Sequence, residues 1–289
     1  MTGNTGNTGN TGNTGNTGNT GNTGGPGGWF FADRVDLPFT FAVLNGQNPP
    51  LPTSITAIPY YPEALWDQSW KAWLVLQDFS ATSWQACPFS SAEAQRPTAP
   101  ADIAAELGTL EKAAVDERPD ALGEILSQAE EFLSYFIDVL GINTTAFPMT
   151  RRLLHIGNLV GLFAVMYYKD KYKRVRPSQL LPALMPPIPV PGHASYPSGH
   201  STQGHLVAAC VKLALPGPDA NGAPSATTVA LSAALDVLAD RIARNREIAG
   251  LHYSSDSGAG VELATFCLPL LQGLTSFQTI VTAAQKEWQ

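Results

Sequence analysis

The segment Gly192-His193-Ala194-Ser195-Tyr196-Pro197-Ser198-Gly199-His200-Ser201 joins a turn of small residues and proline to a long apolar stretch. That stretch predicts a helix over residues 200–212. The backbone N–H groups of Ser198 and Gly199 would then lie at the helix N-terminus, where unpaired donors and the helix dipole attract negative charge. Gly199 also lets a ligand approach the backbone closely. The segment therefore predicts an anion-binding loop.

Cationic side chains flank this loop in the sequence on both sides. Upstream, six residues separate Lys169 from Arg176-Pro177, and downstream, five residues separate Arg246 from His252, with Asp256 one helical turn later. Arginine suits a tetrahedral oxyanion such as phosphate, because its planar fork bonds two oxygens and keeps its proton. A lone helix cap or surface cation would have only a structural role. Three blocks together favour one ligand, an oxyanion.

In order and internal spacing, the three blocks resemble the superfamily of type 2 phosphatidic acid phosphatases, bacterial acid phosphatases and vanadium haloperoxidases. The blocks are Lys169…Arg176-Pro177, Pro197-Ser198-Gly199-His200 and Arg246…His252…Asp256, and they span about 88 residues. One departure is Asn245, which stands where the family usually has serine; that serine is not an anion ligand. The resemblance implies an all-α bundle with an oxyanion pocket.

The resemblance also implies a role for each site residue. His252 would be the nucleophile that attacks phosphorus and forms a phosphohistidine. Asp256 would hold one imidazole N–H, which leaves the other ring nitrogen free. His200 would be the general acid that protonates the leaving alkoxide and then activates water. The phosphate ligands would be Lys169, Arg176, Ser198, Gly199 and Arg246. This phosphoester hydrolase, which needs no cofactor, is the preferred hypothesis.

The second hypothesis is a vanadium-dependent haloperoxidase that oxidises bromide or iodide. In such members of the superfamily, vanadate occupies the phosphate pocket as cofactor, and the residue matching His252 is bonded to the metal. His193, seven residues before His200, lies in a sequence that resembles the bromo- and iodoperoxidase pattern. It is therefore a candidate for a halide site, with lining of the pocket mouth as the alternative. The phosphatase is preferred because it needs no residue beyond those found and the chain is shorter than typical haloperoxidases.

Composition limits the partners. The 289 residues are 44% hydrophobic, which is ample for a core, and the net charge of −7 argues against nucleic acid as a partner. Positive charge is concentrated in residues 169–176. The N-terminus lacks a signal peptide pattern, and the most apolar run, residues 153–168, is short and interrupted, so we expect a soluble protein without a membrane span. Three cysteines, few and far apart, indicate neither a disulfide framework nor a zinc site.

The chain divides into three predicted regions. Residues 1–28 hold seven Gly-Asn-Thr triplets, which have the glycine period of collagen without its proline. They predict either a flexible tail or a collagen-like element, so a homo-oligomer and a non-catalytic collagen-like scaffold stay as alternatives. Residues 29–100, rich in proline and tryptophan, predict an irregular wrapping segment with one helix near residues 63–76. Residues 101–289 predict the α-helical catalytic domain.

Helical periodicity dominates after residue 100, and no strand-like alternation of any length appears. Asp102 and Asp120 are predicted N-caps, the second for one helix that reaches residue 140 and ends at Gly141. Thr150 is expected to open the helix that carries Lys169 in its last turn. The remaining helix predictions are helices over residues 200–212 and 227–247 and a last helix that begins near residues 255–256. Residues 178–192 predict a proline-rich loop, and Trp66, Trp70 and Trp73 predict a packed stripe.

Overall fold

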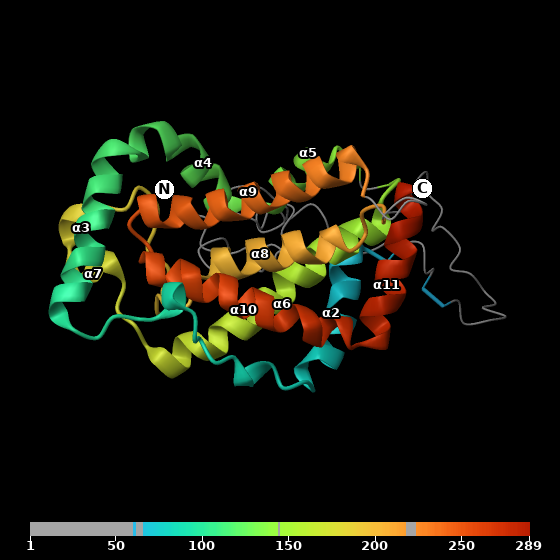
Figure 1. The fold of residues 1–289 in the computed structure, drawn as a ribbon, viewed down its shortest axis with the longest axis horizontal. Helices are drawn as coiled ribbons and strands as arrows, with labels where there is room; N and C mark the ends of the chain where they lie inside the picture. The colour runs from blue at the N-terminus through green and yellow to red at the C-terminus, as the bar shows by residue number, and fades with distance from the viewer. Residues whose placement is uncertain (1–59, 62–65, 144, 218–223) are drawn as a thin grey trace, which may run out of the picture.

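The computed structural model describes residues 60–61, 66–143, 145–217 and 224–289. The repeat over residues 1–28 and residues 29–59 lie outside the described residues, and with them the predictions of a tail, a scaffold and an oligomer. Within the described part of the chain every regular element is helical, which confirms the predicted all-α class. In Figure 1, α8 lies at the centre of the bundle, where it packs against α6, α9 and α10.

The helices have the following bounds: α2 Gln68–Ser80, α3 Pro100–Asp116, α4 Arg118–Glu130, α5 Leu133–Leu140, α6 Pro148–Tyr172, α7 Pro177–Leu180, α8 Gly199–Lys212, α9 Ala226–Ile248, α10 Ser254–Gln272 and α11 Thr275–Gln285. Short 3-10 turns lie at Trp84–Ala86, Ala92–Ala94, Pro182–Leu184 and Lys286–Trp288.

Two glycines bring α6 and α8 into backbone contact. A Cβ atom on Gly157 would lie 2.8 Å from the Cα atom of Val207, and one on Gly161 would lie 3.0 Å from the Cα atom of Gln203. Because backbone atoms form both obstacles, a change of rotamer cannot relieve them. The close approach holds the end of α6, which carries Lys169, in a fixed position relative to the start of α8.

Substitution of Gly157 by alanine is expected to destabilise the protein by about 1–3 kcal/mol, because an added methyl group overpacks the contact between α6 and α8. Gly108 in α3 is the matched control, since no atom lies within 4 Å of a Cβ built there. Gly108→Ala is expected to stabilise by up to about 1 kcal/mol through helix propensity. Urea unfolding of both variants measures the two free energies, and the same sign for both would contradict the packing argument.

Three predicted helix starts are wrong by two or three residues. The helices with predicted N-caps Asp102 and Asp120 begin at Pro100 and Arg118, and the helix expected to open at Thr150 begins at Pro148. Each has a proline at its first or second position, where the fixed φ angle and the missing N–H favour a helix start. Asp102 and Asp120 lie in the first turns instead, where their charges still complement the helix dipoles.

The single helix predicted to reach residue 140 is two helices. α4 ends at Glu130, and the carboxylate of Glu131 accepts hydrogen bonds from the backbone N–H groups of Leu133 at 2.6 Å and Ser134 at 2.8 Å. This side chain satisfies the unpaired donors of a new helix start, so the chain begins α5. Gly141, with a φ angle of 62°, ends α5 as predicted. The break frees the last carbonyl oxygens of α4 for contacts with the site.

The predicted tryptophan stripe is wrong. Trp66, Trp70 and Trp73 are each about 40% exposed; Trp70 and Trp73 lie on the outer side of α2, and Trp66 lies just before the helix begins. The helix instead packs against α6 through smaller apolar residues, Ala72, Val75, Leu76 and Phe79, which are buried. The spacing of the tryptophans fits a helix face, but smaller side chains allow α2 and α6 to approach more closely.

The linker between α6 and α8 is mostly irregular, as predicted. α6 ends at Tyr172, and Lys173 takes a left-handed conformation with a φ angle of 50°. The helix therefore stops before Pro177, which begins the short helix α7 rather than ending α6. The residues that follow form one 3-10 turn and coil before α8 begins.

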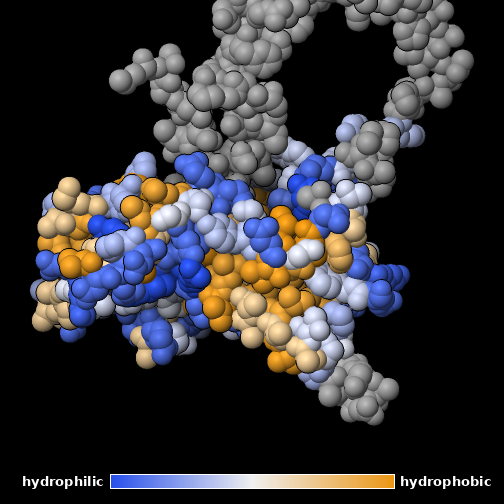
Figure 2. Space-filling model, turned by 90° about the horizontal axis from the view of Figure 1, so that it is seen from above, coloured by the Kyte–Doolittle hydropathy of each residue, from blue (hydrophilic) through white to orange (hydrophobic). Residues whose placement is uncertain are grey.

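The outer surface carries exposed apolar side chains. Seen from above the view of Figure 1, the molecule shows a broad apolar area beside strongly hydrophilic stretches (Figure 2). Among the described residues, no single helix has the length and apolar composition to cross a membrane; only the bent pair Ser254–Gln272 and Thr275–Trp288, at 92°, meets that test together. The three cysteines, Cys87, Cys210 and Cys267, are buried and free.

Candidate active site

The predicted site residues meet at one end of the bundle. The last turn of α6 carries Lys169, the end of α9 carries Arg246, and α8 begins at Gly199. A tight turn at Gly250, whose φ angle is 77°, leads from α9 to His252 and α10. A cavity of about 140 Å³ is lined by six of the nine predicted residues, Lys169, His193, Gly199, His200, Arg246 and His252. Arg176, Ser198 and Asp256 lie directly behind them.

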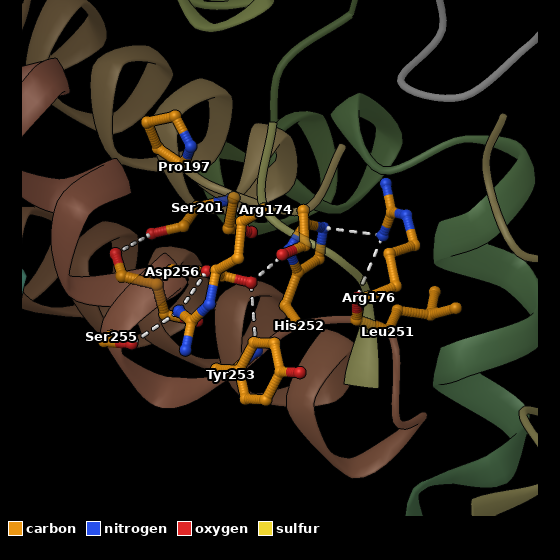
Figure 3. A network of polar contacts seen from close by, with 12 residues as sticks. Arg174, Arg176, Pro197, Ser201, Leu251, His252, Tyr253, Ser255 and Asp256 are labelled. Carbon is orange, nitrogen blue, oxygen red and sulfur yellow. Dashed lines mark hydrogen bonds and ion pairs between the residues drawn. The ribbon is translucent and has the colours of Figure 1, made fainter. Parts of the chain in front are cut away.

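His252 has one ring nitrogen held by a carboxylate and the other by a guanidinium (Figure 3). Its Nδ1 lies 3.2 Å from Oδ2 of Asp256, and its Nε2 lies 3.4 Å from Nη1 of Arg176. A carboxylate only accepts and arginine only donates, so the ring carries its proton on Nδ1 and a lone pair on Nε2. Burial, followed by the charges of Arg176 and Lys169, holds the pKa of His252 well below its usual range. The neutral ring has the form that a nucleophile requires.

Asp256 is fully buried and makes contacts with both oxygens. Oδ2 accepts from His252 and from the backbone N–H of Tyr253 at 3.1 Å, and Oδ1 accepts from Nη1 of Arg174 at 2.7 Å. Arg174 belongs to none of the three sequence blocks, although it lies in the basic run two residues before Arg176. The sequence shows that positive charge is concentrated in this run, but only the fold shows that Arg174 pairs with Asp256 in α10.

Most N–H groups of Arg176 donate to acceptors of the protein itself. Nε donates to the carbonyl oxygen of His193 at 2.9 Å, and Nη1 donates to that of Leu251 at 2.9 Å. Nη2 lies 3.1 Å from Nδ1 of His193, and the same Nδ1 lies 3.1 Å from the carbonyl oxygen of Ala194. Burial lowers the pKa of Arg176 to about 10, and the charge of Asp256 opposes this shift. Arg176 is thus a fixed cation beside the proposed nucleophile.

Lys169 is 2% exposed, and its ammonium group holds the anion loop together. Nζ donates to the carbonyl oxygens of Ala194 at 2.9 Å, Ser195 at 2.9 Å and Pro197 at 2.6 Å. An ammonium has three N–H donors, so these contacts use all of them. Burial and then the charge of Arg176 hold the pKa of Lys169 well below its usual range. As the structure stands, Lys169 contributes a buried positive charge to the cavity and fixes the loop.

Arg246 differs from the other two cations because its guanidinium is almost unpaired. It is 2% exposed, and its one hydrogen bond to the described residues runs from Nη2 to the carbonyl oxygen of Ile125 at 3.0 Å. Its Nε is buried without a partner among them. Burial lowers the pKa of Arg246 to about 10, and no carboxylate offsets this shift. A buried cation without a counter-charge is costly, so this position favours a bound anion.

His200 takes its partner from α4. Its Nε2 lies 3.3 Å from the carbonyl oxygen of Gln128, and its ring lies 5.3 Å from that of Phe132. Because the carbonyl accepts, Nε2 carries the proton and Nδ1 is the remaining nitrogen. Burial and the nearby Arg246 and His252 hold the pKa of His200 well below its usual range. Asn245, the departure from the family pattern, donates to Oε1 of Gln128 at 2.9 Å and so ties α9 to the same turn of α4.

The start of α8 presents fewer free donors than the sequence predicts. The N–H of Ser198 donates to the carbonyl oxygen of Asp256 at 2.8 Å, and its hydroxyl caps α8 by accepting from the N–H of Ser201. Among the described residues, the N–H groups of Gly199 and His200 have no acceptor. Ser198 therefore joins α8 to α10, and Gly199 supplies the first free N–H at the helix start.

His193 lines the cavity and supports Arg176 through both its ring and its carbonyl oxygen. Burial, then the charge of Lys169, lowers the pKa of His193 to about 4. Its role at a halide site stays a prediction.

Part of the cavity lining is apolar. It is formed by side chains of α6, the proline-rich linker and the turn before α10, namely Leu162, Val165, Ile188, Pro189, Pro191 and Leu251. The cavity thus combines cationic side chains and histidines with apolar side chains.

Comparison with known proteins gives similarities in fold alone. No family model matches the chain, and no curated protein matches it significantly. Among solved structures, it is similar to a protein described as the first transmembrane PAP2 type phosphatidylglycerolphosphate phosphatase from Bacillus subtilis. That match has a TM-score of 0.44 and 18% identity, and it covers 72% of this chain and 96% of the other.

Proposed function

We propose that this protein is a phosphoester hydrolase that works through a phosphohistidine at His252. The observation that carries the proposal is Arg246, a buried guanidinium with one hydrogen bond to the described residues, in the same cavity as His200 and His252. Such a cation lacks a counter-charge, and a phosphate ester supplies one. Phosphoryl transfer depends mainly on positioned cations and donors, because its transition state spreads negative charge over the phosphoryl oxygens.

In the proposed reaction His252 and His200 act in sequence. Nε2 of His252 attacks phosphorus while the bond from phosphorus to the alcohol oxygen breaks. His200, which takes up a second proton on Nδ1 when the anion binds, gives that proton to the oxygen. Water then attacks the phosphohistidine, His200 takes the proton, and the P–N bond breaks to release phosphate. Asp256 accepts the Nδ1–H of His252 throughout and stabilises the positive charge that develops on the ring. Arg246 and Gly199 hold the phosphoryl oxygens.

Anion binding is expected to take up protons. In the free protein, burial and neighbouring cations hold the pKa values of His200 and His252 below their usual range. A bound dianion favours their protonated forms and raises those pKa values, so affinity falls as pH rises. Sulfate is a suitable probe, since it stays a dianion between about pH 5 and about pH 8. Titration calorimetry in buffers of different ionisation enthalpy measures the uptake, and an affinity independent of pH would contradict it.

A vanadium-dependent haloperoxidase is the alternative for the same residues. The unpaired guanidinium of Arg246 and the Nε2 lone pair of His252 suit vanadate as well as phosphate. When bound, vanadate would supply the centre that activates peroxide. His193 is the chain's own candidate beside it, although its Nδ1 already contacts Arg176 and the carbonyl oxygen of Ala194.

One pair of assays separates these functions. The full chain is incubated with an activated aryl phosphate, and the vanadate-loaded chain with peroxide and bromide or iodide. We expect phosphate release, competitively inhibited by vanadate. If the chain oxidises halide but releases no phosphate, and His193→Ala loses that oxidation, the haloperoxidase becomes the preferred function. If the folded chain binds sulfate but performs neither reaction, the non-catalytic scaffold is the hypothesis that remains.

A further inference from the structure

A buried chain of charged groups runs from α3 to the proposed nucleophile. Oε2 of Glu106 lies 2.6 Å from Nη2 of Arg174, and Nη1 of Arg174 lies 2.7 Å from Oδ1 of Asp256. The other oxygen of Asp256 lies 3.2 Å from Nδ1 of His252. The side chains of Glu106 and Arg174 are 13% and 7% exposed, and that of Asp256 is fully buried. Neither Glu106 nor Arg174 belongs to the three sequence blocks.

Figure 3 shows that Arg174, Asp256 and His252 are each held by more than one contact, and Glu106 is held in the same way. Nη1 of Arg174 also donates to Oγ of Ser255 at 2.7 Å, and the guanidinium lies 3.7 Å from the ring centre of Tyr253. Oε1 of Glu106 accepts from the N–H of Ser255 at 3.0 Å and from Oγ of Ser254 at 3.3 Å. Glu106 therefore holds Arg174 with one oxygen and the start of α10 with the other.

We infer that Glu106 and Arg174 are positioning residues for His252, acting through Asp256; this inference rests on the proposed function. Arg174 holds Oδ1 of Asp256, so the carboxylate cannot rotate and Oδ2 remains directed at the imidazole. The orientation of the ring then follows, with Nε2 beside Arg176. A nucleophile misplaced by about 1 Å can lose about 100-fold in rate, so this support is expected to affect turnover.

The charges of the three groups also matter. Arg174 alone would neutralise Asp256, whereas Glu106 restores a net negative charge to the trio. When His252 attacks phosphorus its ring becomes positive, and a net negative neighbour stabilises that state. Loss of the Glu106 charge should therefore slow the formation of phosphohistidine more than it weakens the binding of an anion.

The test compares Glu106→Gln and Arg174→Lys with a matched control. Glu106→Gln keeps an oxygen acceptor but loses the negative charge. Arg174→Lys keeps the positive charge but loses the planar guanidinium that bonds two carboxylates at once. Glu117→Gln is the control, since Glu117 accepts from Arg244 at 2.6 Å and has no contact with the cavity residues. Each variant is measured for kcat, for the Kd of inorganic phosphate, and for the 1H–15N resonance of the His252 Nδ1–H. Thermal unfolding shows whether each is folded.

We expect kcat of Glu106→Gln to fall about tenfold and that of Arg174→Lys about 100-fold. The Kd of phosphate should stay within about twofold, because Arg246 and Gly199 are untouched. The Nδ1–H resonance should shift in both variants and stay unchanged in Glu117→Gln. If Arg174→Lys fails to fold, Glu106→Gln decides the question.

Two outcomes overturn the inference. One is a folded Glu106→Gln with unchanged kcat and an unchanged Nδ1–H resonance. The other is a loss of kcat that is matched by an equal loss of phosphate affinity, which would indicate general damage to the cavity. Failure of the proposed function is distinct, because a wild-type protein without phosphatase activity still shows whether Glu106 and Arg174 determine the His252 resonance.

Discussion

Replacement of His252 by alanine is expected to lower phosphomonoester turnover by about 10⁴-fold or more and to leave the fold intact. Nε2 of the ring carries the lone pair proposed to attack phosphorus, and removal of the ring leaves no atom at that position to form the covalent intermediate. Loss of the ring also removes one acceptor contact of Arg176, but the carbonyl oxygens of His193 and Leu251 still hold that guanidinium. The fold therefore does not depend on His252.

The measurement is phosphate release from an activated aryl phosphate by purified His252→Ala. His205→Ala is the control, because His205 lies on α8 but pairs with Asp240 at the surface, away from the cavity. The control should turn over like the wild type. Turnover of His252→Ala at a wild-type rate would show that another group attacks phosphorus, and the assignment of the nucleophile would then be wrong.

The side chains of the three sequence blocks lie close together because each block is local. In Arg246…His252…Asp256, the spacing spans the end of one helix, a tight turn and the first turn of the next, so short-range geometry brings the side chains together. The prediction that Asp256 lies next to His252 is confirmed at 3.2 Å. The predicted chemical roles depend on a reaction, and they stay predictions.

Contacts between distant segments could not be predicted in the same way. The carbonyl oxygen of Gln128 faces His200 only because α4 ends at Glu130, and the carboxylate cap of Glu131 that starts α5 was not recognised in the sequence. Every residue has a carbonyl oxygen, so no residue type marks this acceptor. Glu106 likewise approaches Arg174 through the packing of α3, which no periodic pattern specifies.

The sequence also could not predict which acceptors the N–H donors of each cation contact. Spacing places Lys169, Arg176 and Arg246 near one another, but it does not show where their donors point. The structure directs all three donors of Lys169 to carbonyl oxygens and most of those of Arg176 to the loop and the turn before α10. Arg246 alone keeps most of its donors without a protein acceptor among the described residues.

Arg246→Met is expected to have two opposite effects. Turnover should fall about 10³-fold or more, because an arginine that stabilises a phosphoryl transition state contributes that much. The free energy of unfolding of the ligand-free protein should instead rise by about 1 kcal/mol or more, because an apolar side chain replaces a buried charge that has no counter-charge. Phosphate at 100 times its Kd should stabilise the wild type by about 2.7 kcal/mol and the variant hardly at all.

Arg118→Met is the control for this pair of effects. Arg118 donates to the carbonyl oxygens of Ile248 at 2.9 Å and Leu184 at 2.8 Å, so its loss leaves buried acceptors unpaired and should destabilise the protein. Phosphate should still stabilise that variant. Denaturant unfolding with and without phosphate measures both proteins. If Arg246→Met were destabilised as much as Arg118→Met without phosphate, Arg246 would have a structural role, and the anion site would lose the observation that supports it most.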